Sequence, residues 1–112
     1  MDCNDPGKVA AFWSEALGWA VQESDGVLWM SASGAPFPDM LLVFVAVPEA
    51  KSVKNRVHLD VNPVGCDRDH EVARLVALGA RPVDVGQGDP SWVVLADPEG
   101  NEFCVLDRRI DG

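Results

Sequence analysis

The stretch that decides the fold reads KNRVHLDV and spans Lys54–Val61, near the middle of the chain. Strand alternation places His58 and Asp60 on one face. Three branched aliphatic residues share the opposite face: Val57, Leu59 and Val61. We therefore predict a strand with one side packed on a core. We expect the other side, which carries an imidazole and a carboxylate, to face a space that solvent can enter.

Composition bounds the class of protein. The chain has 112 residues, enough for one domain with its own core. Nine Lys and Arg against eighteen Asp and Glu give a formal net charge of −9. Binding to phosphate groups requires a basic face, so we expect neither a nucleic acid nor a membrane as partner.

The cysteines are three and widely spaced, at Cys3, Cys66 and Cys104. No CxxC motif occurs, which disfavours a zinc knuckle or a disulfide framework. The first residues contain neither a basic segment nor an apolar run of the kind that directs export. We therefore expect a cytoplasmic protein with reduced thiols.

The residue pattern in the first half of the chain predicts one helix and three strands, which follow a short first strand at residues 2–3. Asp5 and Pro6 are suited to begin the helix, and Gly18 is suited to end it. Strands are expected at 19–22, 27–30 and 40–47, with a turn at 24–26 and a loop at 33–38. The almost unbroken apolar run Met40–Val47 favours a strand buried on both faces.

The second half repeats this order. Asp67 or Asp69 can cap a helix whose inner face carries Val72, Leu75 and Val76, and Gly79 ends it. Strands are expected at 81–85, 91–96 and 102–106. A turn at 86–90 joins the first two of these strands, and the sequence DPEGN at 97–101 forms a second turn.

The two halves align at Ala16–Gly18 and Ala77–Gly79, both of which read ALG. This register places residues 2–3 beside 60–61, and 27–30 beside the strand around 92–95. Each half therefore reads strand, helix, strand, strand, strand. We expect two modules, about 1–50 and 55–107, in a single domain that spans 1–112.

Three segments resemble the vicinal oxygen chelate superfamily, in its glyoxalase-like, bleomycin-resistance-like branch. They are FWSEALGW at 12–19, KNRVHLDV at 54–61 and LADPEGNEFCV at 95–105. The resemblance covers essentially the whole chain. It implies an α+β fold in which paired βαβββ modules form a cupped mixed or antiparallel sheet, with helices outside and a ligand cavity inside. Homodimers are also implied by the resemblance.

The metal enzymes of this superfamily hold a divalent ion with side chains from the first and last strand of each module. His58 matches the histidine of the second module, and Cys104 stands where an acidic ligand is expected. The matching places in the first module fall near Val45 and just before Met1. The resemblance thus leaves two alternatives for the cofactor, a divalent metal held by His58 and Cys104, or none.

Two pairs of polar residues are expected to meet in the cavity. His58 and Asp60 share one strand face, and so do Glu102 and Cys104. Together they suit a Zn²⁺ or Fe²⁺ ion, acid–base catalysis with His58 and Glu102, or a Cys/His nucleophile. The structural alternative is a hydrogen bond between His58 and Asp60 with Cys104 as a buried apolar group.

Tryptophans supply the apolar part of the predicted site. Trp13 lies on the inner helix face and is expected in the core. We expect at least one of Trp29 and Trp92 to line the cavity. The sequence therefore predicts a glyoxalase-like domain that binds a small organic molecule. The alternatives are a metal-dependent lyase, isomerase or dioxygenase, and a non-catalytic protein that sequesters a drug.

Overall fold

The computed structural model describes residues 1–32, 34, 40–84, 86 and 91–108. The predicted loop at 33–38 and turn at 86–90 therefore lie almost entirely outside the described residues, as does the end of the strand predicted at 81–85. The chain divides into two compact units, Met1–Lys51 and Ser52–Gly112. Each unit is described by itself.

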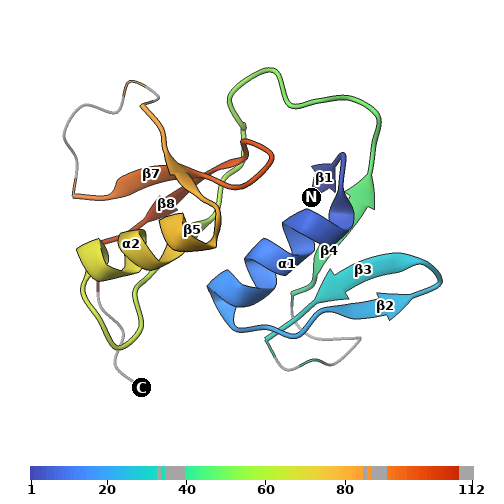
Figure 1. The fold of residues 1–112 in the computed structure, drawn as a ribbon, viewed down its shortest axis with the longest axis horizontal. Helices are drawn as coiled ribbons and strands as arrows, with labels where there is room; N and C mark the ends of the chain where they lie inside the picture. The colour runs from blue at the N-terminus through green and yellow to red at the C-terminus, as the bar shows by residue number, and fades with distance from the viewer. Residues whose placement is uncertain (33, 35–39, 85, 87–90, 109–112) are drawn as a thin grey trace. The chain divides into compact units, whose positions relative to one another are not determined.

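Unit 1 is a βαβββ module (Figure 1). Its elements in chain order are β1 (Asp2–Cys3), α1 (Pro6–Leu17), β2 (Gln22–Ser24), β3 (Val27–Met30) and β4 (Leu42–Ala46). The sheet order is β1-β4-β3-β2, in which β1 runs parallel to β4 and the other pairs are antiparallel. The helix contributes Val9, Phe12 and Trp13 to the core of this unit.

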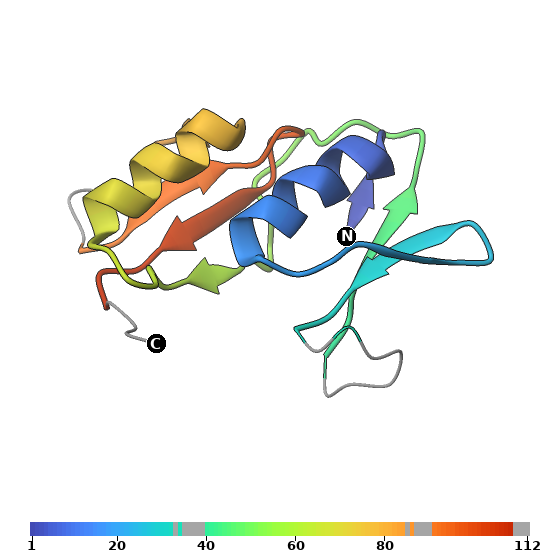
Figure 2. The ribbon, with the colours of Figure 1, turned by 60° about the horizontal axis from the view of Figure 1, so that its bottom comes forward.

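Unit 2 repeats the same topology. Its elements are β5 (Asp60–Val61), α2 (Arg68–Leu78), β6 (Arg81–Pro82), β7 (Val93–Ala96) and β8 (Glu102–Val105). The sheet order is β5-β8-β7-β6, again with one parallel pair, β5 with β8. Each helix crosses one face of its own sheet (Figure 2). The predicted α+β fold of two βαβββ modules with mixed sheets is confirmed, while a shared cup stays a prediction.

The predicted equivalence of the two modules holds at single residues. Asp2 pairs with Val45 in unit 1, and Asp60 pairs with Cys104 in unit 2. Val45 is therefore the counterpart of Cys104, close to where the family resemblance placed it.

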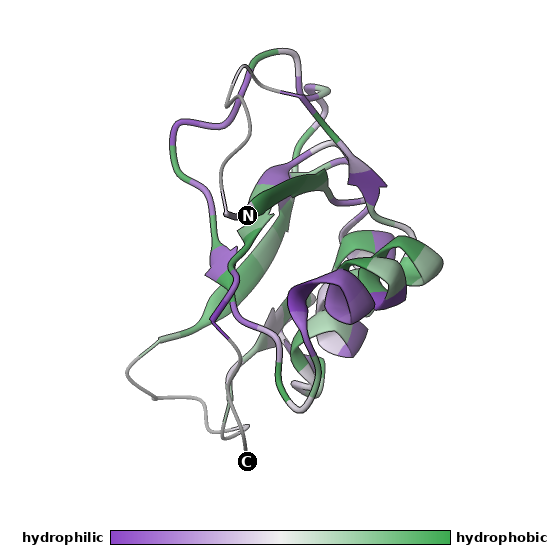
Figure 3. Cartoon of the chain, turned by 90° about the vertical axis from the view of Figure 1, so that its left-hand side faces the viewer, coloured by the Kyte–Doolittle hydropathy of each residue, from purple (hydrophilic) through white to green (hydrophobic). Residues whose placement is uncertain are grey.

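Both helices begin and end as predicted. The Asp5 carboxylate accepts a hydrogen bond from the Lys8 amide at 3.1 Å, and Pro6 occupies the first turn of α1. Asp67, rather than Asp69, caps α2 and accepts from the His70 amide at 2.9 Å. Gly18 ends α1 at φ 73°, in the left-handed region that glycine adopts without strain. The first residues of α2 are hydrophilic, shown in purple in Figure 3.

The predicted strand at 57–61 is shorter than expected. Regular pairing is confined to Asp60–Val61, preceded by one hydrogen bond from the Cys104 amide to the Leu59 carbonyl at 2.9 Å. Strand β8 begins at Glu102, directly after a turn, and Glu102 stands opposite His58 in this register, so the residues before His58 have no strand beside them. Val57 is 84% exposed, and its predicted place in the core is wrong.

The apolar run Met40–Val47 does not form a strand buried on both faces. Only Phe44 of β4 is buried, while Val45 is 45% exposed and Met40 67% exposed. Alternation explains the difference, because α1 covers only the Phe44 face of this sheet.

Smaller corrections concern the first hairpin and α2. The strand predicted at 19–22 is displaced to Gln22–Ser24, and the turn consists of Asp25 and Gly26, both with positive φ. On α2, Leu75 is buried as predicted, but Val76 is 40% exposed. Glu71 is buried in addition, with its carboxylate 2.6 Å from Arg74 Nε.

The turn at 97–101 is organised by one buried carboxylate. Asp97 is fully buried, and its Oδ1 accepts hydrogen bonds from the Glu99 and Asn101 amides, both at 2.9 Å. Gly100 closes the turn at φ 91° and donates its amide to the Asp97 carbonyl at 2.9 Å. The predicted turn is confirmed. None of the helices in the described ranges has the length and apolar character needed to cross a bilayer.

We predict that Asp97→Ala lowers the free energy of unfolding by about 3 kcal/mol, because it leaves part-buried amide donors without their acceptor and empties a fully buried position. Chemical denaturation monitored by circular dichroism measures this change. Asp107→Ala, at an exposed position near the end of β8, is the matched control and should stay within about 0.5 kcal/mol of the wild type. Equal losses in the two variants would contradict the role of Asp97.

A second prediction concerns acid stability. The His70 amide, followed by the His70 side chain, holds the pKa of Asp67 below its ordinary value. A lowered folded pKa contributes stability above the unfolded pKa, and this stability is lost as pH falls through the folded value. Asn at position 67 still accepts from the amide but cannot titrate. The stability of Asp67→Asn relative to the wild type should therefore be constant above about pH 5 and should rise below about pH 4. Denaturation curves across this range are the measurement, and a constant difference throughout would refute the prediction.

Candidate functional site

Unit 2 contains a cavity of about 380 Å³. Polar groups on one side come from His58, Asp60, Glu102 and Cys104, together with Lys54. The apolar part of the lining includes three further side chains: Trp92, Val94 and Leu106. The volume lies within the range of small-molecule pockets, as does the combination of an apolar wall with a few polar groups.

The sheet register explains why these side chains meet. Asp60 pairs with Cys104 across the parallel ladder, and Cys104 pairs with Val94 across the antiparallel one. Directly paired residues point to the same side of a sheet, so the three form one row along the cavity floor. Glu102 and Leu106 lie two residues from Cys104 and share its face. The sheet register thus brings the two polar pairs together in this cavity, and their roles there stay predictions.

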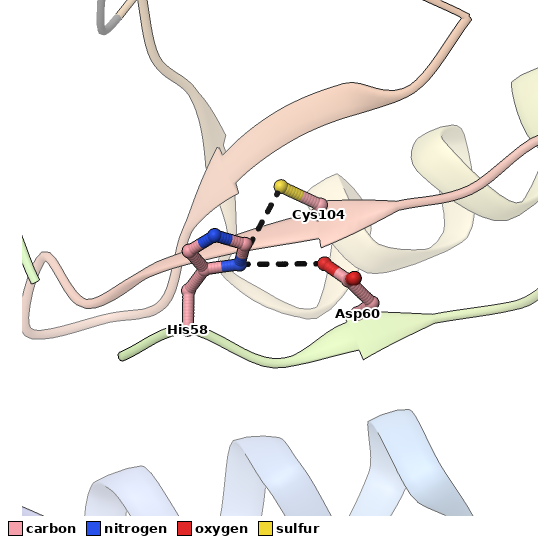
Figure 4. A group of neighbouring side chains, drawn as sticks. All are labelled: His58, Asp60 and Cys104. Atoms are coloured by element: carbon pink, nitrogen blue, oxygen red, sulfur yellow. Dashed lines mark hydrogen bonds and ion pairs between the residues drawn. The ribbon is translucent and has the colours of Figure 1, made fainter. Parts of the chain in front are cut away.

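His58, Asp60 and Cys104 form a tight cluster (Figure 4). His58 Nδ1 lies 3.3 Å from Asp60 Oδ1 and 3.9 Å from Cys104 Sγ. The side chains of His58 and Asp60 are 40% and 50% exposed, while Cys104 is only 7% exposed. The cluster is thus reachable from solvent at the imidazole and carboxylate, and closed at the thiol.

Electrostatics hold the thiol in its neutral form. Burial raises the pKa of Cys104, and the nearby Asp60 carboxylate raises it further, while Lys54 opposes the effect. An activated cysteine nucleophile requires the reverse, a pKa lowered by positive charge. The Cys/His nucleophile considered from the sequence is therefore the least suited of the alternatives to this environment.

Glu102 has a structural role in addition to its place in the cavity wall. It is buried, and its Oε1 accepts a hydrogen bond from the Asn55 amide at 2.9 Å. The Asn55 side chain also reaches Asn101 Oδ1 at 3.4 Å. Glu102 therefore ties the segment before His58 to β8, and its catalytic role stays a prediction.

The tryptophans occupy different environments. Trp13 is buried in unit 1, edge-on to Phe12 at 5.2 Å, as predicted. Trp92, one of the two predicted candidates, lies in the cavity lining. Trp29 lies on β3 and donates its indole N–H to Ser24 Oγ at 3.0 Å. Contact of either indole with a ligand stays a prediction.

Sequence reasoning missed four contributors to the cavity, namely Lys54, Gly86, Val94 and Leu106. Leu106 continues the alternation of Glu102 and Cys104, so the strand pattern contained the signal. Lys54 lies in the quoted central stretch, but it precedes the paired part of β5, so no strand pattern locates it. Nearby, Arg68 donates to the Ser91 carbonyl and so anchors the residue next to Trp92.

The donor set of the cluster fits a divalent metal. Tetrahedral Zn²⁺ with imidazole, carboxylate and thiolate ligands separates their donor atoms by about 3.3–3.8 Å. The observed separations from Nδ1 are 3.3 Å to oxygen and 3.9 Å to sulfur, and the three donor atoms lie within 4.8 Å of one another, so the side chains would have to draw closer to hold an ion. The thiol proton must leave when a metal binds, which is unfavourable in this environment.

Two βαβββ modules with a cavity on the sheet of one module define the glyoxalase-like class of fold. The family model described as "Glyoxalase-like domain" matches residues 1–106. The chain belongs to this glyoxalase-like family. A search of curated protein sequences gave no significant match.

Solved structures support the same fold. A fosfomycin resistance protein, FosX, from Listeria monocytogenes has a TM-score of 0.69 at 15% identity, covering 96% of this chain and 85% of that one. A glyoxalase/bleomycin resistance protein/dioxygenase family enzyme from Burkholderia phytofirmans has a TM-score of 0.63 at 18% identity, covering 94% and 91%. A glyoxalase-related enzyme from Fulvimarina pelagi gives 0.61 at 19%, covering 94% and 83%. At these identities the likeness shows the fold alone.

The raised pKa of Cys104 predicts slow reaction with iodoacetamide at neutral pH, since the thiolate is the reacting form. Alkylation should accelerate above about pH 9, and Asp60→Asn should move this onset to lower pH because it removes a negative neighbour. Peptide mass spectrometry at a series of times measures the alkylation rate of each cysteine separately. Cys66, which is less buried than Cys104, is the internal reference. Rapid labelling of Cys104 near pH 7 in the folded protein would contradict the assignment.

Proposed function

We propose that this domain binds a small organic molecule in the cavity of unit 2. The observation that carries the proposal is that the cavity lining has an apolar part and a polar part. Trp92, Val94 and Leu106 provide apolar surface, and the cluster of His58, Asp60 and Cys104 provides polar groups beside it. An apolar body and one or two polar substituents describe the ligand that such a lining accommodates.

The charged residues that line the cavity restrict the class of ligand further. Asp60 and Glu102 bring carboxylates, Lys54 brings one ammonium group, and the Cys104 thiol is neutral. A strongly anionic ligand would meet repulsion from the carboxylates and from a chain with a net charge of −9. We therefore favour a neutral molecule, and the chain then acts as a binding protein of the drug-sequestering kind.

A second candidate, a metal-dependent lyase, isomerase or dioxygenase, is favoured by the donor geometry. His58, Asp60 and Cys104 would hold the ion, which would supply Lewis-acid activation of a bound oxygen group. Glu102 is then the remaining cavity carboxylate, and its bond to the Asn55 amide fixes its orientation. Fosfomycin belongs among the molecules to be tried, because FosX proteins are among the similar structures.

Binding is tested through tryptophan fluorescence. We expect small aromatic molecules and neutral drugs from a screening panel to change the emission of the wild type. The change should be largely lost in Trp92→Phe, because Trp92 lines the cavity, and kept in Trp29→Phe. Calorimetry with the same compounds separates loss of signal from loss of binding. Binders whose signal survives in Trp92→Phe and disappears in Trp29→Phe would place the site elsewhere.

The metal candidate has a separate test. It predicts about one Zn²⁺ per chain by elemental mass spectrometry, with an affinity that rises with pH because the thiol proton is displaced. His58→Ala and Cys104→Ser should each lower the affinity by about tenfold or more, whereas Cys66→Ser should not. Protein that takes up no Zn²⁺, or uptake unchanged in Cys104→Ser, would exclude this candidate and leave the binding proposal standing.

A further inference from the structure

The imidazole of His58 has two different neighbours at one nitrogen. Its Nδ1 lies 3.3 Å from Asp60 Oδ1 and 3.9 Å from Cys104 Sγ. Its Nε2 points away from the carboxylate (Figure 4), and among the residues that the structure describes it has no hydrogen-bond partner. A neutral imidazole carries its proton on one nitrogen only, so the neighbours of Nδ1 decide which nitrogen faces the cavity as an acceptor.

Two tautomers are compatible with these positions. With the proton on Nδ1, the N–H faces the Asp60 carboxylate. With the proton on Nε2, the Nδ1 lone pair accepts from the Cys104 thiol but also faces the carboxylate. A hydrogen donor beside a carboxylate gains a charge-assisted interaction, and a lone pair in that place is repelled. The thiol is a weak donor and lies at the longer distance, so its contact does not offset this repulsion.

We propose that Asp60 is a positioning residue that holds His58 as the Nδ1–H tautomer and so presents Nε2 to the cavity as a hydrogen-bond acceptor. The Asp60 carboxylate is the charged neighbour of both groups, since it lies 3.3 Å from His58 Nδ1 and raises the pKa of the Cys104 thiol. Asp60 then acts through its neighbour, because its carboxylate faces the imidazole nitrogen.

This assignment predicts which ligands the cavity prefers. The preference rests on the proposed function, the binding of a small molecule in this cavity. A molecule that meets Nε2 must offer an O–H or N–H donor, since the nitrogen has a lone pair and no proton. Such a nitrogen also accepts a proton from a bound molecule, which is the capacity of a general base. The tautomer itself is a property of the protein without ligand.

The experiment is long-range ¹H–¹⁵N correlation spectroscopy of the ligand-free, metal-free protein at about pH 8, where an ordinary histidine is neutral. The chain has two histidines. His70→Gln assigns the two sets of signals. His70 is the internal reference, because its Nδ1 lies 2.7 Å from the Asp67 carboxylate and should show the Nδ1–H pattern. We expect the same pattern for His58, and an Nε2–H pattern for His58 would overturn the proposal.

Asp60→Asn provides the second arm. An amide can turn its N–H₂ toward Nδ1 and donate to it, which stabilises the opposite tautomer, as the aspartate-to-asparagine change does in serine protease triads. We expect His58 to convert to the Nε2–H pattern in this variant while His70 is unchanged. Asp69→Asn, an exposed carboxylate on α2, is the control and should leave His58 as in the wild type. An unchanged His58 tautomer in Asp60→Asn would refute the role of Asp60.

Neither arm uses a ligand. If the tautomer is as expected but no compound changes tryptophan emission, the proposed function fails while the assignment of Asp60 stands. If compounds bind but His58 has its proton on Nε2, the assignment fails and the binding function stands.

Discussion

The parallel pairing of β5 with β8 is the constraint on which the site depends. It sets Asp60 directly beside Cys104 and continues into the hydrogen bond from the Cys104 amide to Leu59. Parallel neighbours cannot be joined by a tight turn, so the chain between them makes a long crossover, here through α2, β6 and β7. The crossover through α2 thus brings together side chains 44 residues apart in the sequence, as Asp60 and Cys104 are.

Much of the fold could be predicted because local signals agreed with one another. Asp5 and Pro6 at the start of α1 and glycines after both helices are short-range features that need no tertiary information. The repeated order of elements placed residues 2–3 beside 60–61, and the family resemblance placed the counterpart of Cys104 near Val45. Both correspondences are present in the sheets. Burial was less predictable. Val57 and Met40 are apolar, but they lie outside the paired strands, and no sequence pattern shows which face a neighbour covers.

The same distinction applies to the site. The i, i+2 spacing of His58 with Asp60, and of Glu102 with Cys104, was sufficient to place four side chains in one cavity. It could not show that Glu102 binds the Asn55 amide, or that Lys54 reaches the wall, because both depend on the path of an irregular segment. It also could not give the protonation state of the thiol, which follows from burial and from the distance to a carboxylate.

One feature of the second module bears on the dynamics of the imidazole. The segment that carries His58 is attached to β8 at two points, the Asn55 amide on Glu102 and the Leu59 carbonyl on the Cys104 amide. Only three residues separate these attachments, so the backbone around His58 has little conformational freedom left to lose. The entropy of ordering this segment is lost when the chain folds, and an arriving molecule meets an imidazole that is already oriented.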